Sequence, residues 1–314
     1  MGIQAVAGTV QHSGVFIPEI WSSKLLVKFY SSCVVASISN TDYEGEIKNV
    51  GDVVKIRQTP DITIRNYTKN SNLVHQRPES SVVEFPIDKA KYFDFIADDI
   101  DVYQSDIKIM TNWAEDAAQQ MKITIEDGSD SDGVFANVYA DAHASNKGAS
   151  AGAKSGDINM GSSGAPLAVT KTDILDQIVD VNTVLSEQNV PETQRWMVVP
   201  VWFCGMILKS DLKDASVAGD GTSILRNGRI GLIDRTEIFE SNLLYSTTDS
   251  SYTVWHALGG QRHALSFAAQ MTKVEHLDKV ESTFGSIVRG LNVYGYKILK
   301  SQALVDFYIR KGTA

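Results

Sequence analysis

The chain has 314 residues, of which 43% are hydrophobic and 21% are charged. This composition is typical of a globular protein and excludes an intrinsically disordered one. The formal net charge is −9 at pH 7, so the chain lacks the basic excess with which proteins grip nucleic acid. No run approaches the roughly 18 uninterrupted apolar residues of a membrane span, so neither a transmembrane helix nor a membrane partner is expected.

The N-terminal sequence and the cysteines argue against secretion. The first residues read MGIQAVAGTVQHSG and lack the basic and apolar regions of a signal peptide. Cys33 and Cys204 are far apart in the chain, and each lies among apolar residues. The sequence therefore predicts two buried, reduced thiols, with neither a disulfide framework nor a cysteine metal site.

Residues 1–44 form the first segment of the chain. Its one apolar patch reads FIPEIWSSKLLVKFY and begins at Phe16. This patch is too sparse to make a core alone. We therefore predict an arm that packs on another surface.

Residues 51–87 read as a long hairpin. Apolar and charged residues alternate in DVVKIRQ, and DITIRNYT and SSVVEFPI repeat the strand pattern around a polar span. From Glu44 to Lys89 the chain carries seven basic and seven acidic residues. An isolated two-stranded hairpin is not stable in water. The hairpin is therefore expected to dock on its own chain or on another copy.

An amphipathic helix is predicted from Ser105 onward. Its apolar residues recur at intervals of three or four, which places them on one helix face. They are Ile107, Met110, Ala114, Ala117, Met121 and Ile125. Ser105 or Asp106 is a suitable N-cap, and the helix is expected to end near Ile125 or to continue past two glycines to about Tyr139.

Residues 145–166 are rich in glycine, serine and alanine. The stretch GASAGAKS, residues 148–155, comes close to a phosphate-binding P-loop, but Ala153 stands where that motif has its second glycine. A P-loop also needs a strand before it and a helix after it. The flanking sequences fit neither, so we predict a flexible loop rather than a nucleotide site.

The second half of the chain alternates between helical and strand patterns. A helix is predicted within residues 170–191, a buried strand at RWMVVP, and a second helix at VWFCGMILKSDLKDA. From Tyr252 onward five strand-like runs follow one another. Trp196 and Trp202 are expected to anchor the core of this half. Together with the hairpin, these patterns predict an α+β fold.

The sequence offers little support for catalysis. The densest acidic stretch lies at residues 94–106 and contains Asp94, Asp98, Asp99, Asp101 and Asp106. Such carboxylates are able to hold Mg²⁺ or Ca²⁺, but a junction between a strand and the N-terminus of a helix also favours them, because the helix dipole attracts negative charge. His263 is interpreted as a hydrogen-bonded structural histidine. No catalytic residue, cofactor or metal site is therefore predicted.

The order of these segments resembles the major capsid proteins of tailed double-stranded DNA bacteriophages, which have the HK97-like fold, and those of short-tailed phages in particular. The resemblance covers most of the chain and rests on the order of elements. It includes the run DKAKYFDFIADDIDVYQSD before the long helix, the unit VPETQRWMVVPVWFCGMIL, and the stretch GRIGLIDRTEIFESNLL. Residues 145–166 depart from the family pattern.

The resemblance implies a division of the chain into parts. Residues 1–44 would be the N-terminal arm and residues 45–90 the extended E-loop. Residues 91–144 would contain the P-domain with its spine helix, and residues 145–254 the A-domain with the Gly/Ser-rich loop. Residues 255–314 would supply the return strands of both domains.

The resemblance also implies a function and partners. The chain would assemble as hexamers and pentamers into an icosahedral shell that encloses double-stranded DNA without sequence-specific binding. Assembly would take place in the host cytoplasm and leave the protein in the virion, with scaffolding, portal and decoration proteins as further partners. An encapsulin-like compartment shell protein and a metal-dependent enzyme using the carboxylates of residues 94–106 are the alternatives.

Contacts between subunits are expected from the arm and from the hairpin. The arm would contribute its aromatic and aliphatic side chains, and the hairpin its basic side chains, which suit complementary charges on a neighbour. These residues are Phe16, Ile17, Ile20, Trp21, Lys55, Arg57, Arg65 and Lys69.

Overall fold

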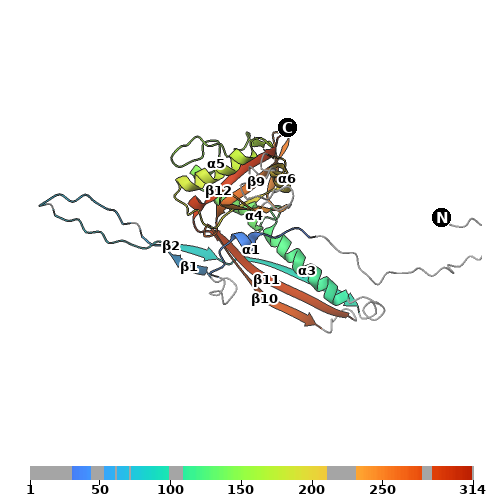
Figure 1. The fold of residues 1–314 in the computed structure, drawn as a ribbon. Helices are drawn as coiled ribbons and strands as arrows, with labels where there is room; N and C mark the ends of the chain where they lie inside the picture. Colours follow the sequence, from blue (N-terminus) through green and yellow to red (C-terminus); the bar gives the residue numbers. More distant parts are fainter. Residues whose placement is uncertain are drawn as a thin grey trace, which may run out of the picture.

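The computed structural model describes residues 30–43, 53–60, 62–70, 72–98, 109–210, 231–277 and 285–312. Figure 1 shows three parts: a rounded part built on a large sheet, an elongated part with a small sheet and a long helix, and a hairpin that projects from their junction. The α+β class predicted from the sequence is confirmed. None of the helices among the described residues is both long and apolar enough to cross a membrane.

The projecting hairpin has a paired root and an unpaired outer part. Strands β1 (Val53–Arg57) and β2 (Val82–Pro86) pair antiparallel, and the last backbone bond of the ladder joins Gln58 to Ser81. The strand predicted over DITIRNYT is wrong, because its described residues, 62–68, are extended but form no ladder. There the Gln76 side chain bonds both the N–H and the carbonyl of Thr63, in place of an opposing strand.

The elongated part is a three-stranded antiparallel sheet with one long helix. The strand order is β10 (Leu265–Leu277), β11 (Gly285–Ile298) and β3 (Lys89–Asp98). Helix α3 (Ile109–Glu126) runs alongside this sheet (Figure 1), and the Trp113 ring meets the Phe95 ring of β3 edge-on at 5.8 Å. The predicted start of the helix at residues 105–108 lies outside the described residues.

Helix α3 ends at Glu126 and does not continue to Tyr139. The chain turns after the helix because the N–H of Gly128 bonds the carbonyl of Leu243, in the other half of the chain. A short helix α4 (Val134–Asn137) and a 3₁₀ turn η2 (Val138–Asp141) follow. The elongated part and the rounded part are therefore joined by backbone hydrogen bonds.

The rounded part contains a mixed seven-stranded sheet. The path β4-β12-β9-β5-β7-β6 runs across it, and β8 pairs with β9 off this path. Its strands are β4 (Leu167–Val169), β5 (Arg195–Val199), β6 (Leu232–Ile233), β7 (Thr236–Glu240), β8 (Ser246–Asp249), β9 (Tyr252–Gln261) and β12 (Leu304–Lys311). The strands predicted at RWMVVP, SYTVWHAL and ALVDFYIRK are confirmed as β5, β9 and β12. The runs HALSFAAQM and KVEHLDK were read as separate strands, but their described residues belong to the single strand β10.

Helices α5 (Ile174–Glu187) and α6 (Val201–Ile207) pack in this part. A Cβ built on Gly259 of β9 would come within 2.7 Å of the side chain of Val181, which shows how closely α5 lies on the sheet. Helix α6 begins directly after Pro200, as expected, but ends at Ile207, earlier than the predicted stretch. Trp196 is buried and Trp202 packs against Phe203, so the prediction that both tryptophans belong to this core is confirmed.

Two apolar clusters hold the molecule together. The larger one joins both sheets, α3 and α5, and also takes in the short helix α1 (Val35–Ile38). The smaller one fixes the hairpin root and consists of Val54, Phe85, Ile87, Ala268 and Val293. Burying such side chains supplies most of the favourable free energy of folding.

The two cysteines differ from expectation. Cys204 is buried within α6, and burial raises its pKa to about 12, so it is an inert core thiol. Cys33 is exposed, so the prediction that it is buried is wrong. It lies just before α1, and the chain buries the neighbouring Val34 and Val35 instead.

Candidate interface of the projecting hairpin

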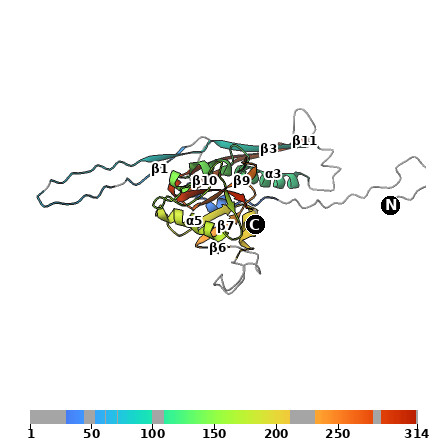
Figure 2. The ribbon, with the colours of Figure 1, turned by 90° about the horizontal axis from the view of Figure 1, so that it is seen from above.

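The outer part of the hairpin exposes apolar side chains to solvent. Figure 2 shows the hairpin extending well beyond both sheets. Five large apolar residues there are between 64% and 89% exposed, namely Ile62, Ile64, Tyr67, Leu73 and Val74. A run of exposed apolar side chains on one projection is typical of a surface that another molecule covers.

The hairpin root packs against the three-stranded sheet. Phe85 is fully buried in the smaller cluster. The backbone also approaches β11 closely, since a Cβ built on Gly295 would lie 2.4 Å from the carbonyl oxygen of Pro86. Glycine at this position therefore permits the contact between root and sheet.

The structure places the hairpin residues predicted from the sequence in two different situations. Lys55 forms an ion pair with Glu84 across the hairpin, 3.5 Å apart, and so is already paired within its own chain. Arg57, Arg65 and Lys69 are exposed along the hairpin. The four arm residues, Phe16, Ile17, Ile20 and Trp21, lie outside the described residues.

A second exposed surface lies on the three-stranded sheet, on the face that carries Tyr92. This residue is 78% exposed, and Ile96 on the same face is 43% exposed. Glu275 forms ion pairs with Lys273 and with Arg289 beside them. This face of the sheet therefore carries both exposed apolar side chains and charged side chains. The hairpin carries the same mixture.

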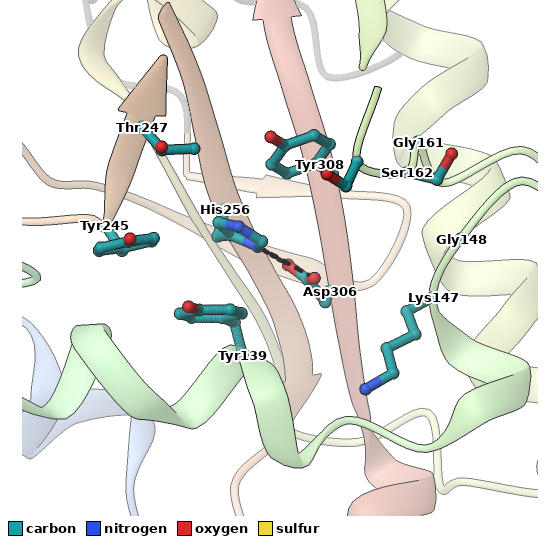
Figure 3. Close-up of a pocket in the computed structure, with 11 residues that line it drawn as sticks. Tyr139, Lys147, Gly148, Gly161, Ser162, Tyr245, Thr247, His256, Asp306 and Tyr308 are labelled. Atoms are coloured by element: carbon teal, nitrogen blue, oxygen red, sulfur yellow. Dashed lines mark hydrogen bonds and ion pairs between the residues drawn. The ribbon is translucent and has the colours of Figure 1, made fainter. Parts of the chain in front are cut away.

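The rounded part contains a cavity of about 360 Å³ that the sequence did not predict. Figure 3 shows His256 at its centre, beside Tyr139, with Asp306 next to it. The Nδ1 atom of His256 lies 2.9 Å and 3.0 Å from the two carboxylate oxygens of Asp306, and its ring stacks on Tyr139 at 3.9 Å between centroids. Burial raises the pKa of the Asp306 carboxyl, while the bond from His256 opposes this effect.

The pair formed by His256 and Asp306 links two neighbouring strands of the sheet. His256 of β9 lies opposite Tyr308 of β12, and Asp306 belongs to the same β12 strand. A signal for the pair was present in the sequence, because an aspartate inside the apolar strand LVDFYIRK needs a buried partner. The prediction chose His263 instead, which is wrong: the side chain of His263 is exposed in the turn between β9 and β10.

The glycine-rich loop provides no phosphate site. The Glu187 carboxylate accepts hydrogen bonds from the backbone N–H groups of Lys154 and Ser155, at 2.7 Å and 3.1 Å. These amides are the groups that a phosphate would need. The loop lacks regular helix and strand over most of its length, as expected, but it is anchored to the body, since Ala151 pairs with Ile158 and Met160 is buried.

The predicted acidic stretch is only partly described. Asp94 is exposed on β3 and Asp98 ends that strand, while Asp99, Asp101 and Asp106 lie outside the described residues. Within the part of the chain that the structure covers, no three acidic, histidine or cysteine side chains are grouped as metal ligands would be.

Comparisons with solved structures identify the fold. A chain from Mycobacterium phage Che8 is 26% identical, with a TM-score of 0.72, and the match covers 93% of this chain and 97% of that one. The capsid structure of Cyanophage P-SCSP1u is 13% identical, with a TM-score of 0.72 and coverage of 95% and 94%. The capsid of Ralstonia phage GP4 is 13% identical, with a TM-score of 0.65 and coverage of 98% and 99%.

These matches cover nearly the whole of each chain. Neither a protein-family model nor a curated protein sequence matches the chain. The likeness is therefore one of three-dimensional structure over nearly the whole chain. The resemblance to phage capsid proteins inferred from the order of elements is confirmed, and the chain has the fold of phage capsid structures.

Proposed function

We propose that the chain is a major capsid protein, a structural subunit of the icosahedral shell of a tailed bacteriophage. The observation that carries this proposal is the hairpin. Its outer part exposes Ile64 at 89% and Tyr67 at 71%, and it is held away from its own body by a buried root. A neighbouring copy would cover this surface, and many copies would bury modest areas repeatedly.

The parts of the chain take corresponding roles in this proposal. Residues 1–44 are the N-terminal arm and residues 45–90 the E-loop of an HK97-like subunit. Residues 91–144 contain the P-domain with α3 as its spine helix. Residues 145–254 form the A-domain, and residues 255–314 return through both. The pairing of β3 with β11, and of β12 with β9, supports this division.

The exposed face of the three-stranded sheet is the natural surface for a neighbour's hairpin. It offers Tyr92 and Ile96 for apolar contact and charged groups at its margin. Residues Arg57, Arg65 and Lys69, together with Lys55 and the arm residues Phe16, Ile17, Ile20 and Trp21, are proposed as contacts between subunits. Such contacts would join the chains as hexamers and pentamers.

The acidic character of the chain suits a wall that encloses DNA. With a net charge of −9, the subunit would not hold packaged double-stranded DNA strongly, because phosphate binding needs a basic excess. The protein would act in the virion after assembly in the host cytoplasm, with scaffolding, portal and decoration proteins as partners. We propose no catalytic role.

Substituting the exposed apolar residues of the hairpin tests the proposal. The double variant Ile62→Ser with Ile64→Ser should fold normally, because both side chains are exposed, but should not form large particles. The matched control is Ile62→Val with Ile64→Val, which keeps the apolar surface. Sedimentation and light scattering measure the outcome. Normal assembly of the serine variant would contradict the role given to the hairpin.

A further inference from the structure

Residues 161–166 of the glycine-rich loop form a strap beside the cavity that contains His256. Gly161 to Ser163 belong to the lining of this cavity. Figure 3 shows the ring of Tyr308 between His256 and this part of the strap. The strap is therefore one wall of the cavity, and its position decides how open the cavity is on that side.

Both ends of the strap are anchored on strand β12. Just before the strap, Met160 is fully buried, and its carbonyl accepts a hydrogen bond from the N–H of Tyr308 at 2.8 Å. Just after the strap, Leu167 begins β4 and pairs with Ile309. The strap is thus a short segment between two fixed points.

The middle of the strap is a small turn that buries no apolar side chain. Ser162 and Ala165 bond each other's backbone at 3.2 Å and 2.9 Å, and residues 163–165 are exposed. Gly161 and Gly164 adopt positive φ angles of 79° and 82°. Glycine loses more conformational freedom on ordering than any other residue. The turn therefore needs a specific bond to stay against the body.

That bond comes from Asp249, at the end of β8. One carboxylate oxygen of Asp249 accepts the N–H of Gly164 at 2.6 Å and the hydroxyl of Tyr308 at 3.0 Å. The N–H of Gly164 is the main cause that holds the pKa of this carboxyl below its ordinary value. Among the described residues, this is the one hydrogen bond that joins the turn to another element.

The bond to Asp249 requires the strap to reach across the sheet. Met160 lies beside the edge of β12 that faces away from β9, whereas β8 lies on the far side of β9. Neighbouring strands are about 4.8 Å apart, so the turn extends over two strands. The strap thus passes over the face of the sheet on which the cavity lies.

The strap shields a nitrogen atom that is free to bind or react. The side chain of His256 is only 13% exposed, and its Nδ1 atom is taken up by Asp306. No hydrogen bond joins its Nε2 atom to the part of the chain that the structure describes. The cavity therefore encloses an imidazole nitrogen with neither a protein partner nor ready access to solvent.

We propose that residues 161–166 are a lid, that Asp249 is its latch, and that release of the latch opens the cavity around His256 to small molecules. Opening breaks the bond from Gly164 and leaves both anchored ends in place, so the sheet stays intact. Segments held by few apolar contacts and by exposed backbone bonds are those that open locally. The inference goes beyond the proposed shell function and does not depend on it, because every subunit carries its own cavity, lid and latch.

A second carboxylate holds another part of the same loop and provides a comparison. Glu187 bonds the N–H groups of Lys154 and Ser155, neither of which lines the cavity. Loss of the Glu187 carboxylate should therefore loosen residues 152–156 and leave the cavity closed.

Chemical modification of His256 in the purified full-length chain measures the opening of the lid. Diethyl pyrocarbonate adds an ethoxycarbonyl group to an unprotonated ring nitrogen of histidine, and mass spectrometry of the peptides gives the rate at each site. The exposed His263 is the internal standard. Asp249→Ala removes the latch. Tyr308→Phe is the matched control, because it removes the other bond of Asp249 and keeps the bond from Gly164.

We expect Asp249→Ala to raise the modification rate of His256, relative to His263, about tenfold. Hydrogen exchange of residues 161–166 should rise with it. Tyr308→Phe should react like the wild type. Glu187→Ala should raise exchange at residues 152–156 and leave the rate at His256 unchanged.

An unchanged rate at His256 in Asp249→Ala would overturn the inference. An equal increase in Tyr308→Phe would also overturn it, because the contact of the tyrosine, and not the lid, would then protect His256. Hydrogen exchange of β5 separates local opening from unfolding. If β5 also exchanges faster, Asp249→Asn replaces Asp249→Ala, and a rate at His256 equal to that of the wild type would overturn the inference. None of these readouts requires assembly, so a negative result would leave the shell function standing.

Discussion

Glu126 connects the start of the described chain to the end of the long helix. Its two carboxylate oxygens accept hydrogen bonds from the backbone N–H groups of Val34 and Val35, at 2.8 Å and 2.9 Å. These N–H groups begin α1, where they have no partner within the helix. Glu126 therefore caps α1 from α3 and fixes the position of this short helix on the body.

Burial of this carboxylate makes the stability of the joint depend on pH. Burial raises the pKa of Glu126 from 4.5 to about 7, against the two backbone bonds, which lower it. Because the folded pKa is above the unfolded one, the contribution to stability is fully present below pH 4.5 and is lost as pH rises through 7. The difference corresponds to about 3 kcal/mol in the free energy of unfolding.

Urea unfolding of Glu126→Gln should reveal this dependence. Glutamine is neutral at every pH, so the variant should lose the part of the stability change that the wild type shows between pH 5 and pH 8, a range set by the pKa shift. Glu115→Gln, an exposed position on the same helix, should retain the wild-type profile. Identical profiles for wild type and Glu126→Gln would show that Glu126 does not titrate in this range.

Arg195 is a buried cation whose bonds all go to neutral oxygens. Its guanidinium donates to the carbonyls of Pro191, Asn182 and Val190 and to the hydroxyl of Ser186. It thereby ties the end of α5 to the start of β5.

Replacing Arg195 by methionine should lower the free energy of unfolding. The variant keeps an unbranched side chain but leaves buried carbonyl groups without donors, at a cost of about 3 kcal/mol. Lys311→Met, at the exposed end of β12, should change stability by less than about 0.5 kcal/mol. Thermal unfolding followed by circular dichroism compares the two, and equal stabilities would contradict the role assigned to Arg195.

At the scale of elements, a substitution in the hairpin root should loosen the hairpin without unfolding the body. Phe85 belongs to the small cluster of the hairpin root and not to the larger core. Phe85→Ala should therefore release the root, since such truncations cost about 3–5 kcal/mol, while both sheets remain folded.

Limited trypsin digestion measures this effect. The variant should be cut faster at Arg65 and Lys69 relative to sites in the body, and its main thermal transition should stay close to that of the wild type. Tyr92→Ala, which removes an exposed aromatic side chain from β3, is the matched control. Unchanged cleavage in the Phe85 variant would mean that the root does not depend on this cluster.

Elements whose apolar pattern faces a core were predicted well from the sequence. The alternation at β1 and the helical spacing of Ile174, Ile178, Val181 and Leu185 correspond to buried side chains, so pattern and structure agree. The outer hairpin was predicted as a strand because Ile62 and Ile64 alternate with polar residues. Such alternation predicts a strand because one face of a strand is usually buried. In the single chain, however, Ile62 and Ile64 remain exposed.

At the scale of the whole molecule, the order of elements was more informative than any single motif. The near match to a P-loop was correctly set aside, because the loop amides serve Glu187 instead. The pair of His256 and Asp306 was missed because its members are 50 residues apart. Only the pairing of β9 with β12 brings them together, and a single sequence gives no direct sign of that register.

The single chain leaves large apolar side chains exposed on two of its surfaces. The hairpin presents exposed apolar residues, and the three-stranded sheet presents Tyr92. Each surface would be covered in a closed array of identical copies, and neither of them is covered within one chain. These features belong to one account, in which folding produces a subunit and assembly completes the burial.

Electron microscopy of the purified full-length chain, expressed alone and with a scaffolding protein, tests this account most directly. The account predicts closed isometric shells of uniform diameter, in which the hairpin of each subunit lies on its neighbour. A chain that remains a 34.4 kDa monomer under both conditions would contradict it.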